Sequence, residues 1–292
     1  MYAFASHSVI SLGCALVVSV VLCISANAQE VNDWASFGLK GRVKSILLER
    51  SKVVIKNGRE VEDRRQPLEQ TDFDQCGYYT DRIGLENGNK RQFRNKHDHQ
   101  CRIVERTELG SDEIRLYRYS PGKIETSTEL RGGHLLDRNI YNLDDRGRTL
   151  VAEYFLVDEK LGRRLYDPPA KILYKYGDDG NLIERSYLET DGTASSGLFG
   201  ESKYIFKYTN GRLVEWTAYK TDGSEFGTWI RQYDSQGRIV EVSSNRFGKT
   251  TYSEFDAQGN WHKSTRYSRV VNNGKTTEAP IEIDYRQITY YE

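Results

Sequence analysis

His97, His99 and Cys101 alternate along one short stretch of the sequence, and these residue types bind zinc and copper. In an extended chain, residues two apart point to the same side, so the three side chains can share one ion. The same stretch, HDHQCRIVE from residue 97, however repeats YDSQGRIVE from residue 233. His97 then stands in the position of an aromatic residue and Cys101 in that of Gly237. The repeat explains both residues, and we predict no metal and no cofactor.

Nucleophilic catalysis needs a serine or cysteine beside a base and an orienting group. Beyond residue 28 the chain offers His97, His99, His134 and His262 as bases, but it has no G-x-S-x-G motif. With 42 acidic residues, some carboxylate pair always has the spacing that glycosidases use, so such pairs are uninformative. The sequence contains no P-loop and no dinucleotide fingerprint. We therefore predict no catalytic residue and favour a protein that is not an enzyme.

Tryptophans are the remaining residues with a chemistry of their own. Trp216, Trp229 and Trp261 fall in the last third of the chain, whereas Trp34 lies near its start. Exposed aromatic rings in a row can stack on sugar rings, so these three residues are candidate ligand-binding residues for a glycan. The alternative is that they replace missing aliphatic residues in the core.

The elements that must position these residues form a repeat. Aligned on the glycine, its copies are FDQCGYYTD at 73, HDHQCRIVE at 97, YSPGKIET at 119, LDDRGRTLV at 143, YGDDGNLIE at 176, YTNGRLVE at 208, YDSQGRIVE at 233 and FDAQGNWHK at 255. An aromatic residue ends one strand, a polar segment turns, and the glycine takes a positive φ before the next strand begins. Each copy therefore predicts a β-hairpin.

Two rows of residues follow from the repeat. The second residue after the glycine is mostly apolar or aromatic and predicts a buried row: Tyr79, Ile103, Ile124, Thr149, Leu182, Leu213, Ile239 and Trp261. Two residues further on, and thus expected on the same face, glutamates recur at 105, 184, 215 and 241. We interpret these glutamates as strand ends that reach water beside a Lys or Arg of the neighbouring strand, rather than as a catalytic or metal-binding ladder.

The predicted fold is all-β, with antiparallel hairpin repeats forming one continuous curled or spiralling sheet over a single domain, residues 29–292. YD-like repeats span about 70–265, and the segments 39–62 and 281–292 alternate like strands. With 37% hydrophobic residues and 20 tyrosines, a shallow sheet covered by tyrosine is favoured over a thick core. Insertions at 157–171 and 189–202 are either functional loops or tolerated excursions.

The chain begins with an apolar run, Val9 to Ile24, followed by Ala26-Asn27-Ala28. Small residues three and one before the cut are what signal peptidase accepts, so residues 1–28 are predicted to be a signal peptide and the mature chain to begin at Gln29. No Lys or Arg precedes the run, which leaves an uncleaved membrane anchor as the alternative. Cleavage implies a periplasmic or extracellular protein with no membrane contact.

Cleavage leaves two cysteines, Cys76 and Cys101, and an even pair in an oxidising compartment predicts one disulfide. The two residues lie in neighbouring repeat turns, one residue apart in register. Successive turns on one sheet edge are about 9–10 Å apart, whereas a disulfide needs Cα atoms within about 7 Å. One turn must therefore lean toward the other.

The repeat pattern, as in Tyr233-Asp234 and Gly237-Arg238-Ile239, resembles the YD repeats of RHS-type bacterial surface proteins. LKGRVKS at 39–45 and the closing YRQITYY are similar to those of small secreted bacterial proteins with such repeats. The resemblance implies a secreted β-repeat scaffold, in some cases associated with carbohydrate binding. The chain is too short to close a large shell and has no toxin domain after the last repeat, so a toxin role is not implied.

Charge excludes one class of partner, because 42 basic and 42 acidic residues leave no positive excess for nucleic acid. The sequence thus favours an exported, non-catalytic binding or structural module with a glycan or protein partner that it does not identify. A small secreted hydrolase of envelope or extracellular polysaccharide and an immunity-like binder of a secreted toxin are the alternatives.

Overall fold

The computed structural model describes residues 32–85, 89–156, 170–197, 199–272 and 275–292. Over these residues the chain forms nineteen strands in one sheet and one helix of four residues. Every strand pairing is antiparallel, which confirms the predicted all-β antiparallel class. Within the same residues, no helix is long and apolar enough to span a membrane.

The helix α2 is Asp33–Ser36. The first strands are β1 Val43–Lys56, β2 Arg59–Glu62, β3 Gln66–Phe73, β4 Tyr79–Gly84, β5 Lys90–His97, β6 Ile103–Glu108, β7 Glu113–Ser120, β8 Lys123–Leu130, β9 His134–Leu143 and β10 Thr149–Leu156. They are followed by β11 Lys171–Tyr176, β12 Leu182–Leu188, β13 Glu201–Thr209, β14 Arg212–Lys220, β15 Glu225–Tyr233, β16 Ile239–Ser244, β17 Gly248–Phe255, β18 Trp261–Asn272 and β19 Lys275–Tyr290.

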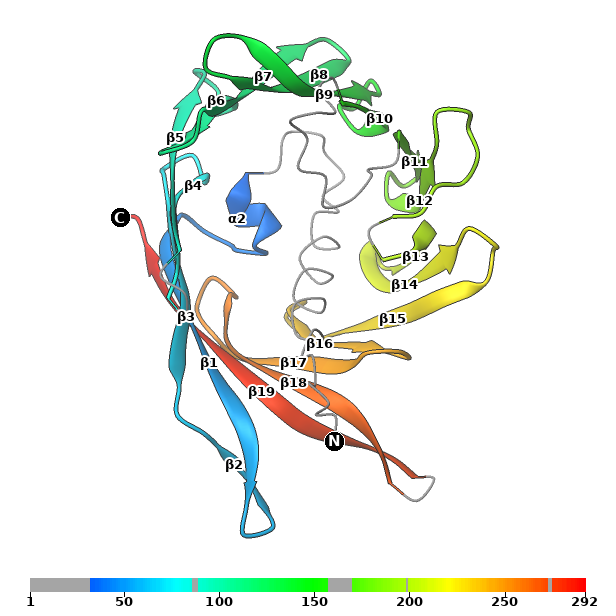
Figure 1. The fold of residues 1–292 in the computed structure, drawn as a ribbon. Coiled ribbons are helices and arrows are strands. Elements are labelled where there is room, and N and C mark those ends of the chain that lie inside the picture. The colour runs from blue at the N-terminus through cyan, green and yellow to red at the C-terminus, as the bar shows by residue number, and fades with distance from the viewer. Residues whose placement is uncertain (1–31, 86–88, 157–169, 198, 273–274) are drawn as a thin grey trace, which may run out of the picture.

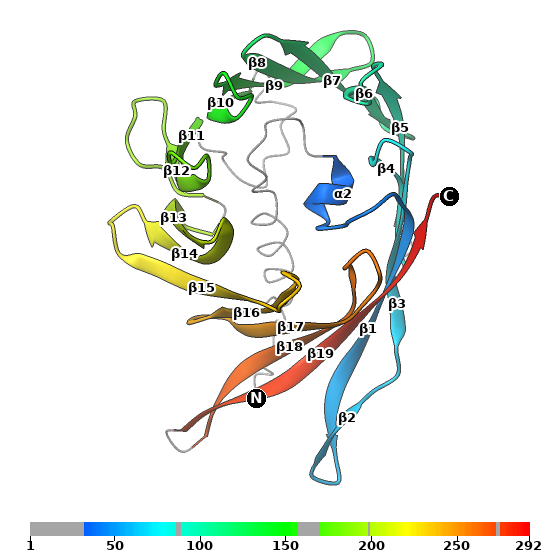
Figure 2. The ribbon, with the colours of Figure 1, turned by 180° about the vertical axis from the view of Figure 1, so that it is seen from behind.

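The sheet closes into a barrel, which corrects the prediction of an open curled or spiralling sheet. From β3 to β19 each strand pairs with the next one in sequence, and β1 pairs with β3 on one side and with β19 on the other. Ser45, for example, is opposite Asp72 and also opposite Thr289. Eighteen strands form the ring, while β2 extends it as a hairpin on the far end of β1 (Figures 1 and 2).

The two end segments expected to be strands, 39–62 and 281–292, supply this closure as β1–β2 and the end of β19. The predicted signal peptide at 1–28 and most of the insertion at 157–171 lie outside the described residues. In the second insertion, 189–202, the chain makes a tight turn at Glu189–Thr193 and Ser195 donates a hydrogen bond of 2.5 Å to Glu189.

One five-residue turn recurs along one edge of the barrel. At Asp234 the carboxylate oxygen Oδ1 accepts hydrogen bonds from the backbone N–H groups of Gln236 and Arg238, while the Gly237 N–H donates to the Asp234 carbonyl. Turns built in this way start at Asp74, Asp98, Asp144, Asp234 and Asp256. The fourth residue of the turn has a positive φ, +77° in Gly237 and +60° in Cys101. Cys101 therefore adopts the backbone of the glycine whose place it takes.

Arginine and tyrosine connect each turn to the next hairpin. The Arg238 guanidinium donates to the Asp234 carboxylate at 2.6 Å and lies 4.4 Å from the ring centroid of Phe255 in the following repeat. Arg102 and Arg148 lie in the same way over Tyr119 and Tyr176. Tyr119, Tyr176 and Tyr233 donate their hydroxyls to the backbone carbonyls of Ile103, Thr149 and Leu213 in the preceding repeat. The Tyr, Asp and Arg residues that recur in the Y-D-x-x-G-R pattern thus make the contacts that join neighbouring hairpins.

The disulfide predicted between Cys76 and Cys101 is present, with 5.4 Å between the Cα atoms. The turns after β3 and β5 are therefore closer than two strand spacings, as a disulfide requires. Inside the ring, α2 rests on the first of these turns, where Asn32 donates to the Cys76 carbonyl (Figure 1). Gly77 permits this approach, because a Cβ atom there would lie 2.5 Å from the Asn32 side chain.

A β-bulge separates the apolar row from the glutamate row, so the prediction that the two rows share a face is wrong. The register shifts beside Tyr176 and Tyr208, where Leu182 and Leu213 pair. Both leucines are buried in a hydrophobic cluster with Trp216, whereas the following glutamates turn outward. The extra residue at each bulge rotates the strand before the next pair forms. Ile103 and Ile124 are also buried, and the other members of the apolar row are half-buried.

Candidate functional site

The inner side of the barrel is identified by α2, which lies within the ring. The Asp33 carboxylate accepts a hydrogen bond of 2.7 Å from Arg106 of β6, so the Arg106 face is the inner one. Directly paired residues of neighbouring strands lie on one face of a sheet. Following the pairs round the ring from Arg106 places Tyr174, Arg185, Tyr204 and Ala218 on the inner face, and likewise Phe206, Trp216, Trp229 and Ser244.

An aromatic inner wall runs over β11 to β16. We use this name for the inward residues Tyr174, Arg185, Tyr187, Tyr204, Phe206, Tyr208, Trp216, Trp229 and Arg231. The Tyr204 and Phe206 rings are stacked with centroids 6.2 Å apart, and the Trp216 and Trp229 rings are parallel at 5.8 Å. The wall is the larger of the two hydrophobic clusters in the described part of the chain.

Two arginines lie among these rings. The Arg185 guanidinium is 4.6 Å from the Tyr204 ring centroid, and that of Arg231 is 5.2 Å from Trp216. Among the described residues, no carboxylate lies within ion-pair distance of either group. Arg185 is only 9% exposed, so within the described part of the chain this buried cation has no anion beside it. A buried charge without a partner is costly, which makes such a pair of arginines unusual in a merely structural wall.

Four hydrogen-bonding atoms of the wall are shielded from water and have no hydrogen-bond partner among the described residues. They are Nε of Arg185, the hydroxyl of Tyr208, Nε1 of Trp216 and Nε of Arg231, and we call them the donor set. Burial raises the pKa of Tyr208 to about 12, so its hydroxyl keeps its proton at neutral pH. All four groups can therefore donate, and three of them can do nothing else. The wall offers hydrogen bonds that the described chain does not accept.

The three candidate tryptophans do not form one row. Trp216 and Trp229 are paired neighbours on β14 and β15, and they are 3% and 6% exposed. Trp261 begins β18 elsewhere on the barrel, where its ring lies 5.5 Å from Tyr252 and beneath the Arg286 guanidinium at 3.7 Å. The Trp216 and Trp229 rings thus stack on each other, which leaves their stacked faces unavailable to a sugar ring. The group of Trp216 that can bind a ligand is its Nε1–H donor.

The histidines hold separate structural positions. His262 lies between the Arg286 carbonyl at 2.8 Å and the Asp256 carboxylate at 3.3 Å, at the edge of β18. His97 is beside Asp74, and His99 is exposed in the following turn. In the part of the chain that the structure describes, neither His97 nor His262 is hydrogen-bonded to a serine or cysteine nucleophile.

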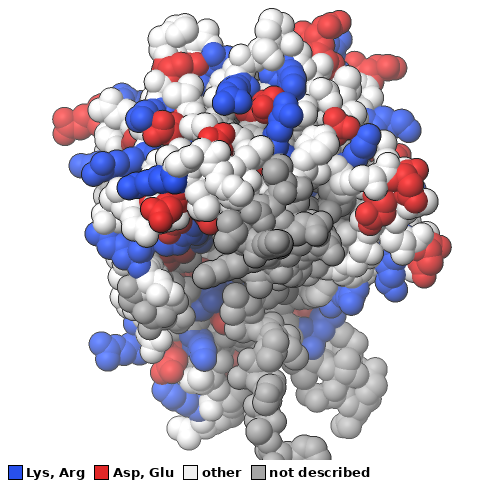
Figure 3. All heavy atoms as spheres, turned by 45° about the horizontal axis from the view of Figure 1, so that its top comes forward, with Lys and Arg blue, Asp and Glu red and all other residues white. Residues whose placement is uncertain are grey.

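The outer side of the barrel carries ion pairs between neighbouring strands. Lys96, Lys175 and Lys207 are the direct cross-strand partners of Glu105, Glu184 and Glu215, and each pair forms a salt bridge. This confirms that the recurring glutamates meet lysine at the water-facing surface. Over β6–β10, basic and acidic side chains are intermingled, without a broad area of one sign (Figure 3).

Sequence reasoning missed Arg185, Arg231 and Tyr208. The signal was the two-residue period of a strand, which puts Arg185 on the face of Tyr187 and Arg231 on the face of Trp229. The period does not predict whether a carboxylate from another part of the chain lies beside these arginines.

Comparisons with known proteins leave the family of the chain open. No family model matches, and no curated protein matches. Among solved structures, the barrel is similar to a porin-like protein from Bacteroides uniformis, with 13% sequence identity, a TM-score of 0.43, and coverage of 86% of this chain and 99% of that one. A second similarity, to TcdB2-TccC3-TEV, has 10% identity and a TM-score of 0.21, and covers 80% of this chain and 17% of that one.

Proposed function

We propose that the protein is an exported, non-catalytic binding module that holds an acidic glycan against its aromatic inner wall. The observation that carries the proposal is the donor set, four buried groups with no acceptor in the described chain. A ligand rich in hydroxyl and carboxylate oxygens supplies the acceptors that these groups lack. Arg185 and Arg231 favour a ligand with negative charge, because a carboxylate pairs with the planar guanidinium through two parallel hydrogen bonds.

One ion pair inside the barrel shows how a carboxylate can bind to an inward-facing arginine. On the inner face of β6, Arg106 lies 4.4 Å from the Tyr79 ring centroid, in an arrangement like that of Arg185 over Tyr204. Arg106 receives a carboxylate from Asp33, which approaches from within the ring on α2. An acidic ligand within the ring can meet Arg185 in the same geometry.

The outer side supports a protein surrounded by water. On β13 the outward residues Lys203, Ile205 and Lys207 place a lysine on each side of one apolar residue, and on β11 Lys171 and Lys175 flank Leu173 in the same way. Residues two apart on a strand are about 6.6 Å apart, so these apolar stretches are about 13 Å or less between charges. A barrel in lipid needs an apolar band about 25 Å tall. We therefore place the module in the periplasm or outside the cell.

The sequence pattern and the disulfide support the same compartment. A bond between Cys76 and Cys101 is maintained where thiols are oxidised. The Asp, Arg and Tyr contacts that join the turns give the YD-like repeat a physical basis, and we propose that the hairpins belong to that class of repeat.

Titration with oligosaccharides, followed by tryptophan fluorescence, tests the proposal. Oligomers of uronic acids should change the emission, because Trp216 belongs to the donor set, and neutral oligomers of the same length should bind more weakly. In Arg231→Met the affinity should fall by about 10- to 100-fold, as expected for one hydrogen bond to a charged group of about 1.5–3 kcal/mol. Lys207→Met, on the outer face of β13, is the matched control and should bind like the unchanged protein.

Three results would overturn the proposal in different ways. A flat titration with every glycan excludes glycan binding. A response to an acidic peptide but to no glycan makes the protein a binder of proteins, as an immunity-like role requires. If the oligosaccharide is shortened during the titration, which is measured as an increase in reducing ends, the protein is a hydrolase.

A further inference from the structure

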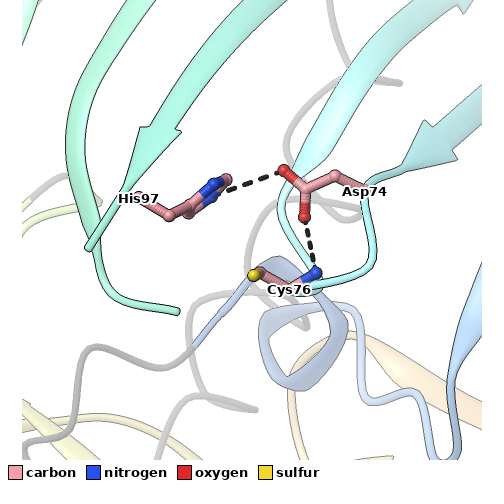
Figure 4. A group of neighbouring side chains, drawn as sticks. All are labelled: Asp74, Cys76 and His97. Carbon is pink, nitrogen blue, oxygen red and sulfur yellow. Dashed lines mark hydrogen bonds and ion pairs between the residues drawn. The ribbon is translucent and has the colours of Figure 1, made fainter. Parts of the chain in front are cut away.

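A mixed group of metal-binding side chains lies where the disulfide joins two turns. Asp74 and Cys76 come from the turn after β3, and His97 ends β5 (Figure 4). One ligand atom from each of the three lies within 4.8 Å of the others. The Cys101 Sγ, bonded to the Cys76 Sγ, adds a fourth ligand at the same place. Two sulfurs, an imidazole and a carboxylate are together the ligand types of structural zinc sites.

The surroundings of the group hold two of its members in place. Oδ1 of Asp74 accepts the backbone N–H groups of Cys76 and Tyr78, while Oδ2 accepts from Asn95 and lies 3.4 Å from Nε2 of His97. That nitrogen is shielded from water, and although it is within ion-pair distance of Asp74 it makes no hydrogen bond. The imidazole is thus fixed beside the carboxylate with one ring nitrogen available.

We propose that reduction of the Cys76–Cys101 disulfide converts this group into a zinc site with Cys76, Cys101, His97 and Asp74 as ligands. In the oxidised chain the two sulfurs share a bond and are not thiolates, so the site does not exist. A dithiol gives two electrons and two protons to the disulfide, which becomes two thiols while the dithiol becomes a disulfide. Zn²⁺ then displaces the two thiol protons and binds both thiolates.

The geometry needs only a local change. In a tetrahedral site with Zn–S bonds of about 2.3 Å, the two sulfurs are about 3.8 Å apart. Once the disulfide is broken, rotation about the side-chain bonds of the two cysteines can bring the sulfurs to this distance, while the turns that carry them stay 5.4 Å apart at their Cα atoms. The metal would keep these two turns joined after reduction. This site departs from the prediction of no metal that we drew from the sequence, and it shares His97 and Cys101 with the set considered there, with Asp74 and Cys76 in place of His99.

Cobalt titration of the reduced protein tests the site. The protein is reduced with a phosphine, which does not bind the metal strongly, and Co²⁺ is added without oxygen. We expect one Co²⁺ per chain, with the intense visible bands of tetrahedral cobalt and a thiolate charge-transfer band, and displacement by Zn²⁺. The oxidised protein should give neither band. Zn²⁺ should also raise the thermal midpoint of the reduced protein and leave that of the oxidised protein unchanged.

Variants separate this site from adventitious binding. His97→Ala and Cys101→Ser should each lower the affinity for Co²⁺ at least 10-fold, and Asp74→Asn tests the carboxylate while it retains an acceptor for the turn. His99→Ala, an exposed histidine of the same turn, is the matched control and should bind normally. Equal binding by the oxidised protein, normal binding by His97→Ala, or no binding by a reduced protein that retains its β-sheet circular dichroism would each overturn the proposal.

Discussion

Arg106 and Arg185 occupy matching places in two halves of the barrel, and within the described residues only Arg106 pairs with a carboxylate. Both face inward and both lie over a tyrosine ring, at 4.4 Å and 4.6 Å from its centroid. Arg106 donates to Asp33 of α2, whereas in the described chain Arg185 meets no carboxylate. The difference between the two arginines is that a helix within the ring brings a carboxylate to Arg106, whereas no described element brings one to Arg185.

Burial changes the pKa of Asp33 in its ion pair with Arg106. It raises the pKa of the Asp33 carboxyl above its ordinary value, and this outweighs the opposite influence of Arg106. A carboxyl group with a raised folded-state pKa stabilises the fold fully below its unfolded pKa, and this contribution is lost as the pH rises through the folded pKa. The ion pair with Arg106 offsets part of the cost of burying the ionised form of Asp33.

The largest effect is expected from Arg106→Met. The substitution leaves the Asp33 carboxylate buried and unpaired, and should lower the free energy of unfolding by about 3–5 kcal/mol at pH 7. The loss should be smaller at pH 4 than at pH 7, because a buried carboxyl group without its cation takes up a proton more readily as the pH falls. Urea unfolding at both pH values measures it, and the double variant Asp33→Asn/Arg106→Met should recover much of the stability. An equal loss at both pH values would show that ionisation of Asp33 is not the cause.

The disulfide comes next. Replacing Cys76 and Cys101 by serine removes a cross-link between residues 25 apart, and should lower the free energy of unfolding by about 3 kcal/mol in the chain-entropy model. Denaturant unfolding of the oxidised protein and the double variant measures the difference. Thiol labelling of the unreduced, denatured protein should find no free thiol at these positions, and two free thiols would contradict the cross-link.

Two tyrosines of the repeat allow a direct comparison between a hydroxyl that has a hydrogen-bond acceptor and one that has none among the described residues. Tyr233 donates to the Leu213 carbonyl at 2.9 Å, so Tyr233→Phe should cost about 1 kcal/mol. Tyr208 holds the matching place in its repeat, but no described residue accepts from its hydroxyl, so Tyr208→Phe should leave the stability unchanged or increase it. Thermal unfolding of both variants distinguishes them. A similar loss in each would mean that the Tyr208 hydroxyl has an acceptor in solution.

The smallest change in stability is expected from Arg185→Met. Replacing a buried cation that has no anion should alter the free energy of unfolding by less than about 1 kcal/mol, in contrast to Arg106→Met. The same variant should lose most of the fluorescence response to an acidic oligosaccharide. If it is instead as unstable as Arg106→Met, Arg185 has a charged partner within the folded chain, and the two halves do not differ.

The sequence by itself determined what depends on neighbouring residues. The spacing of aspartate, glycine and arginine was sufficient to place the turns, because each turn is closed by contacts within five residues. The glycine position of Cys101 followed from the same register and has its positive φ. The disulfide also followed, because only two cysteines remain after the expected cleavage.

Only the tertiary structure decided the closure of the sheet and the composition of its two sides. A repeat specifies how each hairpin meets the next, but closure depends on β1 pairing with β19, whose residues lie more than 200 positions away, as Arg50 and Asp284 do. The sides depend on the bulges, where one extra residue sends Leu182 inward and Glu184 outward. Because the partner of Arg106 comes from α2, 73 positions away in the sequence, no local pattern could show that Arg106 meets a carboxylate and that Arg185 meets none among the described residues.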